Sequence, residues 1–311
     1  MQRRWLVLPF ASLLFASRAG AASSAIDEPT APSERPMAAQ LGTRAELSSF
    51  LGVASSPFFV PEFPEVSGQV VLLRPAVAQR IASSLWVRLA VPLALTSIRQ
   101  PAGSYVDEAA WGNPALGVEY AWSAPIAPRV GWLSVVRATL GLPLAEQGPR
   151  ASQMANRALA LADALQALRE PALYAPGAAS LTLEYRADFA VNGWRFGPVL
   201  SVPLLMRVGE AELPSEQTRA VGLRPRADLR ALYFPKPWFG VGAEASLAFD
   251  WMRIVEPIRG DDVRRRVQPS LRPEVVFDTG RLRFELSCLV AIGGNARGSM
   301  GCGADGVLRF W

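Results

Sequence analysis

The chain has 311 residues, of which 50% are hydrophobic and only 19% are charged, with a formal net charge of +5. It contains no histidine and two cysteines, which excludes histidine-based catalysis, histidine metal sites and a four-cysteine zinc site. Beyond the N-terminal segment, no apolar run approaches the ~18 residues that a membrane-spanning helix needs. The best candidate, residues 85–95, is short and contains Arg88.

Residues 1–22 have the pattern of a secretory signal peptide. Arg3 and Arg4 give a positive start, residues 5–16 are apolar, and residues 19–21 form an A-x-A cleavage site. A buried N-terminal helix is the alternative. Cleavage would remove three arginines and no acidic residue, and the net charge of about +2 that remains gives little reason to expect a nucleic-acid partner.

Residues 23–42 are rich in proline, alanine and serine. This composition predicts a flexible exported linker, and a plug inside a larger structure is the alternative.

The remaining sequence alternates between apolar and polar residues with a period of two. Residues 180–191 and 281–291 are the clearest stretches, and alternation over 10 to 12 residues matches the 9–11 residues that a tilted strand needs to cross a bilayer. Twelve such strands are predicted, at about 43–54, 68–80, 84–96, 113–123, 129–143, 179–191, 194–208, 221–233, 238–253, 266–278, 281–292 and 301–311.

The connections between these strands alternate between short and long. Asn192-Gly193 is a type I′ hairpin signal, whereas residues 55–67, 97–112 and 144–178 are among the long connections. Short turns at one end and long loops at the other are typical of transmembrane β-barrels in the outer membrane. We therefore predict an all-β fold over residues 43–311, a transmembrane antiparallel up-and-down β-barrel of about 12 strands. A soluble β-sandwich is the alternative.

The third long loop contains a helical insert in this prediction. Met154, Ala158, Leu161, Leu165 and Leu168 recur at helical spacing over residues 151–170, within an insert at 149–171 that is bounded by prolines. The helix would lie on the barrel rim or act as a lid over the pore.

Tryptophans and prolines give opposing indications. Trp86, Trp122, Trp132, Trp194, Trp238 and Trp311 fall at predicted periplasmic strand ends, where interfacial aromatic girdles occur. Against the barrel, Pro75, Pro92, Pro198, Pro203, Pro225, Pro269 and Pro273 lie inside predicted strands and remove ladder donors, so bulges or shifted boundaries are required.

Cys288 and Cys302 lie on the last two predicted strands. A hairpin centred on Asn295 places them directly opposite each other, on the apolar face. Because an exported protein meets an oxidising compartment, we expect a structural disulfide.

If the apolar face meets lipid, the polar face lines the lumen. Arg224, Arg226 and Arg230 project from one strand and form a predicted basic track. The residues predicted to govern selectivity are Arg186, Glu184, Asp188, Arg224, Arg226, Arg230, Glu244, Asp250, Arg272, Glu274, Arg281 and Arg283. The wider predicted lining also includes Arg88, Arg137, Arg195, Arg207, Arg309, Glu119, Asp228, Asp278, Glu285 and Asp305. These residues would either select solutes in a pore or form ion pairs that fill a closed barrel.

The strand rhythm and the C-terminal strand, which ends Val307-Leu308-Arg309-Phe310-Trp311, resemble Gram-negative outer-membrane β-barrel proteins. That resemblance implies a terminal aromatic residue that is read by the barrel assembly machinery. Arg309 departs from the pattern, which fits better if Phe310 is the effective last residue.

Residues 111–120, Trp-Gly-Asn-Pro-Ala-Leu-Gly-Val-Glu-Tyr, are similar to a strand motif of the FadL-like and phenol-degradation-pathway outer-membrane transporters. The barrels of those families have more strands than the twelve counted here.

We expect an outer-membrane channel or transporter for small solutes with an Arg-rich, mixed-charge lumen. The alternative is a closed structural barrel whose loops bind partners. The expected partners are outer-membrane lipid, the barrel assembly machinery and a small-molecule solute. We expect a monomer, and we expect no cofactor or metal. We expect no enzymatic activity, because outer-membrane phospholipases, lipid A deacylases and omptin-type proteases rely on a histidine. A hydrolase that uses a pair of carboxylates is a third alternative, although no acidic pair stands without arginine neighbours.

Overall fold

The computed structural model describes residues 41–60, 63–99, 105–127, 130–145, 178–208, 221–249, 267–293 and 299–310. The chain divides into two units, Met1–Pro32 and Ser33–Trp311, and all described residues belong to the second. The predicted signal peptide, most of the predicted linker and the predicted helical insert lie outside the described residues. Among those residues, no helix is long and apolar enough to cross a membrane.

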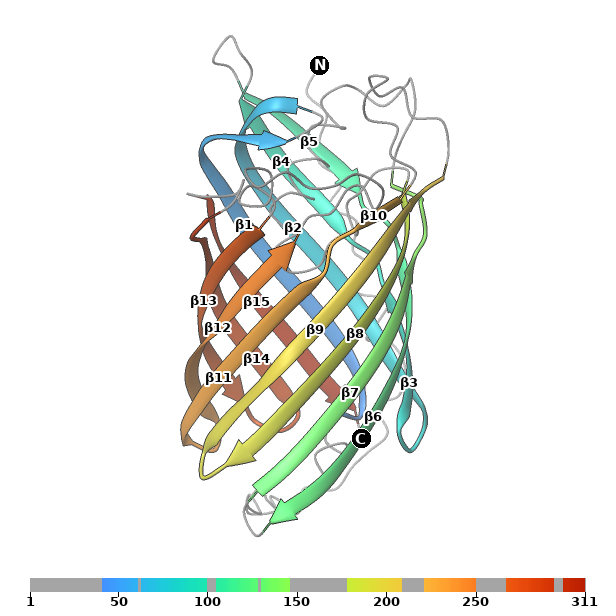
Figure 1. Ribbon diagram of the computed structural model, residues 1–311, viewed down its shortest axis with the longest axis vertical. Helices are drawn as coiled ribbons and strands as arrows, with labels where there is room; N and C mark the ends of the chain where they lie inside the picture. Colours follow the sequence, from blue (N-terminus) through green and yellow to red (C-terminus); the bar gives the residue numbers. More distant parts are fainter. Residues whose placement is uncertain are drawn as a thin grey trace, which may run out of the picture. The chain divides into compact units, whose positions relative to one another are not determined.

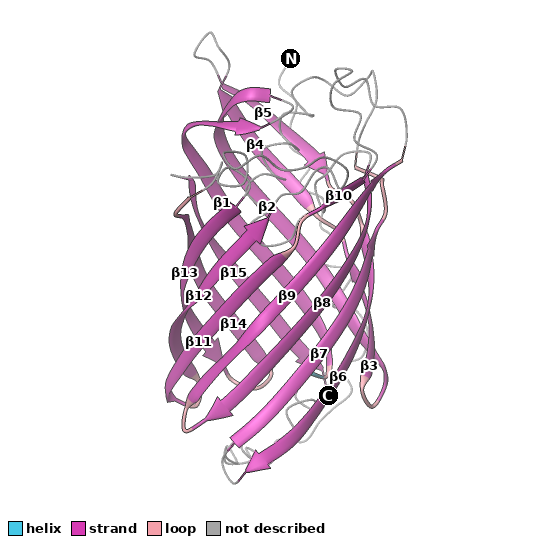
Figure 2. Ribbon diagram, in the orientation of Figure 1, coloured by secondary structure: helices cyan, strands magenta, loops and turns pink. Residues whose placement is uncertain are grey.

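The described part is a single antiparallel sheet of fifteen strand segments (Figures 1 and 2). In chain order the segments are β1 (Thr43–Val60), β2 (Phe63–Ala82), β3 (Leu85–Ala90), β4 (Leu93–Arg99), β5 (Tyr105–Trp111), β6 (Ala115–Ala127), β7 (Val130–Gly141), β8 (Ala178–Val191), β9 (Trp194–Arg207), β10 (Val221–Leu223), β11 (Arg226–Lys236), β12 (Phe239–Phe249), β13 (Val267–Asp278), β14 (Leu282–Ala291) and β15 (Ser299–Phe310). Because β1 pairs with both β2 and β15, the sheet closes into a barrel.

The fifteen described segments form twelve full-length barrel strands, called staves here, because three of the staves are each interrupted once. β3 and β4 both pair with β2 and form one stave. β5 pairs with β4 and β6 pairs with β3, so β5 and β6 form the next stave. β10 and β11 both pair with β9 and form the third interrupted stave. The structure thus confirms the predicted twelve-strand antiparallel barrel. The tight turns lie at one end, called here the turn end, and the opposite end is called the loop end.

Each interruption of a stave falls at a proline, namely Pro92, Pro114 or Pro225. Proline has no N–H to donate to the ladder, but its carbonyl still accepts. Gly112 N donates to Pro92 O at 2.9 Å, and Phe249 N donates to Pro225 O at 2.9 Å, so neighbouring staves stay joined across the breaks. Boundary shifts therefore accommodate Pro92 and Pro225, whereas Pro75, Pro198, Pro203, Pro269 and Pro273 are tolerated inside strands.

Two predicted long loops are mostly strand. Residues 55–67 belong largely to β1 and β2, whose pairing continues to Val60 and Phe63 past register shifts. Residues 97–112 contain the end of β4 and all of β5, which pair from Leu93–Trp111 to Arg99–Tyr105. The sequence prediction ended these strands at the expected membrane boundary, but the hairpins extend farther at the loop end (Figure 1).

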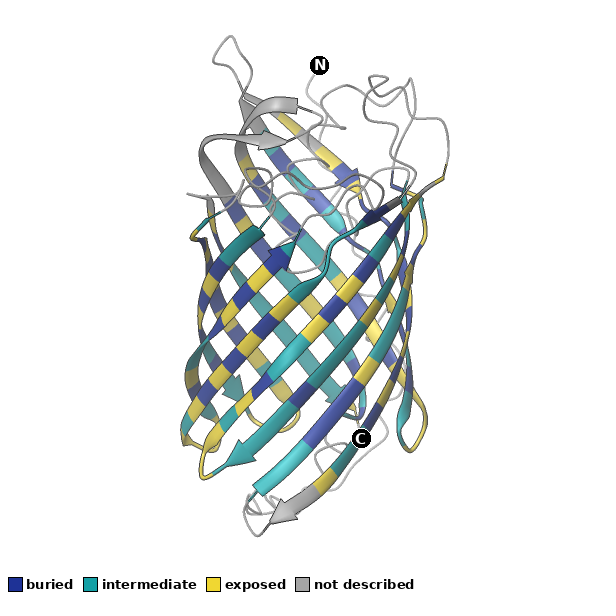
Figure 3. Ribbon diagram, viewed as in Figure 1, coloured by how far each residue is buried: buried dark blue, intermediate teal, exposed yellow. Residues whose placement is uncertain are grey.

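Burial alternates along the staves, as Figure 3 shows. On β14, Leu282, Phe284, Leu286 and Val290 are exposed, whereas Glu285 is buried. Large apolar side chains likewise lie on the exposed face of β6, β8, β9 and β11. The apolar face is therefore the outside of the barrel and the polar face is the inside, which excludes the soluble sandwich.

Aromatic rings gather on the outer face near the turn end. Trp122 packs edge-to-face on Trp132, Trp194 packs on Tyr233, and Trp238 stacks on Phe277. Trp86 departs from the predicted girdle, because its side chain is fully buried and faces inward.

Cys288 and Cys302 are directly paired across β14 and β15 and form a disulfide, as predicted. Both residues are exposed on the outer face. The bond links the last two staves, and β15 closes the barrel against β1.

Removing the disulfide should weaken the closure of the barrel. A Cys288→Ser/Cys302→Ser variant should still fold, because the ladder between β14 and β15 is continuous. Its free energy of unfolding should fall by about 2–4 kcal/mol. The temperature at which the heat-modifiable band is lost on a gel would be compared with and without reductant. Equal stability of the oxidised, reduced and variant proteins would contradict a structural role.

Arginine on the outer face should be costly in proportion to its depth in a bilayer. Leu229 is exposed in the middle of β11, whereas Leu282 is exposed beside a tight turn. Leu229→Arg should lower the free energy of unfolding in lipid vesicles by about 2–4 kcal/mol, and Leu282→Arg by about 0–1 kcal/mol. Urea titration after refolding measures both. Equal losses at the two positions would mean that the outer face does not meet lipid.

Candidate functional site

Every one of the twelve described staves places at least one charged side chain on the inner face of the barrel. These residues are Arg44, Glu46, Arg74, Arg88, Glu119, Arg137, Glu184, Arg186, Asp188, Arg195, Arg226, Asp228, Arg230, Glu244, Arg272, Glu274, Asp278, Arg283, Glu285, Asp305 and Arg309. Several ion pairs skip one or more intervening strands. Such contacts can form only on the concave side of the sheet, so they fix which face is inside.

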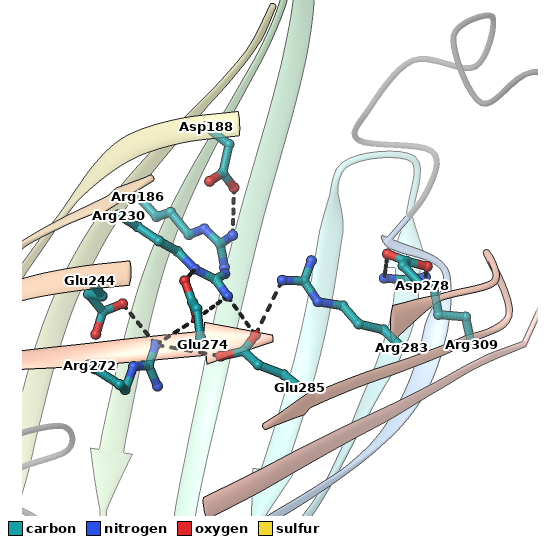
Figure 4. Close-up of polar contacts among 10 residues, drawn as sticks. All are labelled: Arg186, Asp188, Arg230, Glu244, Arg272, Glu274, Asp278, Arg283, Glu285 and Arg309. Carbon is teal, nitrogen blue, oxygen red and sulfur yellow. Dashed lines mark hydrogen bonds and ion pairs between the residues drawn. The ribbon is translucent and has the colours of Figure 1, made fainter. Parts of the chain in front are cut away.

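The first group of charges, here called the C-terminal cluster, consists of Arg186, Asp188, Arg230, Glu244, Arg272, Glu274, Arg283 and Glu285 (Figure 4). Arg230 is at its centre. Its Nε and Nη2 donate to the two carboxylate oxygens of Glu274, each at 2.6 Å, and Nη2 also donates to Glu285 at 2.6 Å. One guanidinium on β11 thereby joins β13 and β14.

Two further arginines extend the C-terminal cluster. Arg272 Nη2 donates to Glu244 at 2.9 Å and lies 3.6 Å from both Glu274 and Glu285. Arg283 Nη2 lies 3.3 Å from Glu285. Arg230, Glu244 and Arg272 are in direct register on β11, β12 and β13, so the strand pairing itself places opposite charges side by side.

The second group, here called the N-terminal cluster, consists of Arg44, Glu46, Arg88, Glu119, Arg137 and Glu184. Glu119 is its centre and is 1% exposed. It accepts from Arg44 Nη2 on β1 at 2.9 Å and from Arg137 Nη2 on β7 at 2.7 Å. Arg137 also reaches Glu184 on β8 at 3.3 Å, on the strand that carries Arg186 and Asp188.

Both clusters are electrically balanced. The N-terminal cluster has three arginines and three glutamates, and the C-terminal cluster has four arginines and four acidic residues. A buried charge is tolerated only when it is paired and hydrogen-bonded, because desolvation costs several kcal/mol for each ion. Together the clusters form a charged girdle on the inner wall.

Apolar side chains border the girdle towards both ends of the barrel. On the turn side lie Trp86, Leu232 and Val276, all at most 2% exposed. On the loop side lie Val70 and Leu289, which are also buried. Where these side chains border the girdle they lower the local polarity, which strengthens attraction between its opposite charges.

Trp86 also marks where the N-terminal end of the described chain meets the barrel. Its indole Nε1 donates to Gly42 O at 2.8 Å, and its ring packs with Leu133, Val135 and Leu41. The prediction placed Trp86 outside by its position near a strand end. Trp86 lies two residues before the inward-facing Arg88 on the same strand, so the two side chains share a face. That alternation would have placed Trp86 inside.

Two members of the predicted basic track are paired with acids. Arg226 Nε lies 2.9 Å from Asp228, and Arg230 is held by Glu274 and Glu285. Arg224 lies at the break between β10 and β11, where its backbone N donates to Pro203 O. The inner wall at this strand is therefore a sequence of alternating charges.

The other predicted lumen residues are distributed as follows. Arg186, Glu184, Asp188, Glu244, Arg272, Glu274 and Arg283 lie on the inner wall, within the two clusters. Arg281 is exposed in the turn before β14, and Asp250 lies outside the described residues. The sequence prediction missed Arg44 and Glu46, although their alternation with Ala45 and Leu47 places them on the polar face.

The segment that resembles the FadL-like motif spans a break in a stave. Trp111 ends β5, and Ala115 begins β6. Between them Asn113 is fully buried; its Oδ1 accepts from Ala145 N at 2.8 Å, and its Nδ2 donates to Ala178 O at 3.2 Å. The asparagine side chain therefore bonds the backbone just beyond the end of β7 and at the start of β8.

No protein-family model and no curated protein sequence matches this chain. The barrel is similar to solved structures. An outer-membrane channel from Pseudomonas putida F1 aligns with a TM-score of 0.57 at 11% identity, over 86% of this chain and 96% of that one. The transport unit of the autotransporter AIDA-I from Escherichia coli aligns with a TM-score of 0.50 at 10% identity, over 93% of each chain. Likeness at this identity shows the fold, that of outer-membrane β-barrels.

Among the described residues, no group of three or more histidine, cysteine or acidic side chains could hold a metal ion. In both clusters the carboxylates have arginine partners, so the charges there are arranged for mutual neutralisation.

Removing the central guanidinium should leave two carboxylates buried without their main partner. Arg230→Met should lower the free energy of unfolding by about 3–5 kcal/mol. The triple variant Arg230→Met/Glu274→Gln/Glu285→Gln should recover most of that loss, because the uncompensated charge is gone. Arg283→Met is the control; with its single ion pair at 3.3 Å it should cost less. A triple variant no more stable than the single one would contradict this account.

Proposed function

We propose that this protein is an outer-membrane channel that lets small solutes cross through a mixed-charge lumen. The observation that carries the proposal is that all twelve described staves bear charge on the inner face, whereas the outer face is apolar. A barrel of eight strands is just filled by its side chains, and larger barrels enclose cavities or channels.

The proposal includes the surroundings of the barrel. An apolar outer face with aromatic rings near the turn end suits an outer membrane, with the tight turns on the periplasmic side. Delivery there would use residues 1–22 as a signal peptide and the C-terminal strand as the segment that the assembly machinery reads. We assign the protein a monomeric state and no catalytic role.

The balanced girdle leads to a specific expectation about selectivity. An unbalanced ring of arginines would favour anions, but here each cluster holds equal numbers of positive and negative side chains. We therefore infer weak discrimination between small cations and anions, with passage governed by size and by hydrogen bonding to the wall.

Conductance of the refolded chain in a planar bilayer tests the channel. Discrete steps are expected, with a reversal potential close to zero under a salt gradient. Glu285→Gln should shift selectivity towards anions, because Arg230 and Arg283 lose a counter-charge, and Arg272→Gln should shift it towards cations. The double variant Glu285→Gln/Arg283→Gln, which removes one charge of each sign, is the control and should return the reversal potential towards the wild-type value.

A second function is favoured by one observation. The central girdle side chains are almost fully buried, with Arg230 at 7% and Glu274 at 3% exposure, as in a barrel closed by ion pairs. A closed barrel would serve as a scaffold for partner-binding loops. A folded, heat-modifiable protein that gives no current steps would support this function and reject the channel.

A further inference from the structure

Three oxygen atoms on β11 and β13 are among the buried side-chain atoms that have no hydrogen-bond partner within the described part of the chain. They are Asp228 Oδ1, Gln268 Oε1 and Ser270 Oγ. Asp228 is 5% exposed and Ser270 is 3% exposed. Buried polar atoms in folded proteins nearly always have a hydrogen-bond partner, so three without one, facing the same lumen, require an explanation.

Strand pairing brings these atoms into one patch. Asp228 is in register with Ser246, and Ser246 with Ser270, so the three residues form a row across adjacent strands. Gln268 is the next inward residue along β13. The patch lies one inward position to the loop side of the row that holds Arg230, Glu244 and Arg272.

The surroundings of the patch are electrically neutral and contain small side chains. Asp228 is paired with Arg226 through Oδ2 at 2.9 Å, which leaves Oδ1 as an acceptor in a neutral pair. Ala248 and Ala291 stand beside Gln268 and Ser270 in the neighbouring strands.

The atoms define the chemistry of their ligand. A carboxylate oxygen and an amide oxygen only accept hydrogen bonds, and a serine hydroxyl can do both. The ligand must therefore present several donors. A cation would lose its hydration shell at this patch without gaining a counter-charge, because Arg226 already neutralises Asp228. Its binding is therefore unfavourable. A neutral solute with several hydroxyl groups satisfies all three atoms without adding charge.

We propose that this patch is a binding subsite for neutral polyhydroxyl solutes, of the sugar or polyol class, on the loop side of the girdle. The inference rests on the proposed function, because a solute reaches this wall only through the lumen. Since the three atoms are buried, a ligand must displace a neighbouring side chain, and the long side chains nearest in register are Arg226 and Arg272.

The test uses D-glucose as the probe and polyethylene glycol of similar hydrodynamic size as a comparator with few hydroxyl donors. Saturation-transfer NMR on the refolded full chain in detergent measures binding without requiring conduction. Glucose should give a saturable signal and polyethylene glycol should not. In a bilayer, glucose should reduce the current saturably, whereas polyethylene glycol should act only through bulk conductivity.

The variant Gln268→Leu/Ser270→Ala removes two of the three atoms and leaves the Arg226–Asp228 pair intact. It should bind glucose about tenfold more weakly, which is roughly what two ordinary hydrogen bonds contribute. Ser287→Ala is the matched control, since Ser287 is an inward-facing, buried serine on β14 that lies outside the patch. Heat-modifiability of each variant shows that it has folded.

The outcomes separate the two proposals. Current without saturable glucose binding, or equal binding by the double variant and the wild type, overturns the subsite and leaves the channel standing. Saturable glucose binding without current supports a subsite that is reached through a lumen open at the loop end only, and rejects the channel.

Discussion

The structure depends on one constraint, which is that a sheet surrounded by apolar material cannot leave an edge open. Each unpaired backbone N–H or C=O would cost several kcal/mol there, and only a closed ring removes both edges. β1 meets this condition by pairing with β2 and β15. The proline breaks are compatible with it because neighbouring N–H groups still donate to proline carbonyls, and because Asn113 supplies side-chain partners at the break beside Pro114.

Closure then determines the chemistry of both faces. When the outside of a closed barrel meets apolar material, an alternating strand must place its polar residues inside, so the inner wall collects charges from every stave. In such a confined space a charge is tolerable only with a partner, and the pairs that form here skip strands: Arg44 on β1 reaches Glu119 on β6, and Arg230 on β11 reaches Glu285 on β14. The ion pairs thus join distant staves and also cancel the field that an arginine-rich wall would otherwise produce.

The sequence predicted those features that depend on period and register. Alternation was sufficient for the twelve staves and for the assignment of faces, and a symmetric hairpin was sufficient to pair Cys288 with Cys302. The extension of the barrel strand that contains β5 outward to Tyr105 was missed because strand length was inferred from bilayer thickness, and a hairpin beyond the rim has no such limit. The partner of each arginine could not be predicted, since contacts that skip strands depend on barrel curvature and side-chain reach. Asp228 lies on the same face as the predicted basic track in the sequence, but the contacts of Arg230 with Glu274 and Glu285 come from other strands and could not be predicted.

The inner wall does not treat all its polar groups alike, and the difference follows the axis of the barrel. In the row of Arg230, Glu244 and Arg272 every residue has a charged partner, which is what stability alone would require. One position towards the loop end, the row of Asp228 and Ser270 keeps acceptors that have no partner among the described residues, beside Ala291 on the neighbouring strand. An inner wall shaped only for stability would have apolar side chains at that position, because a buried acceptor without a hydrogen bond costs about 1–3 kcal/mol. Sites where a sequence breaks such a local rule are expected to be functional. The two rows are therefore best understood as parts with separate tasks: the girdle holds the barrel wall in place, and the row beside it offers acceptors to whatever enters from the loop end.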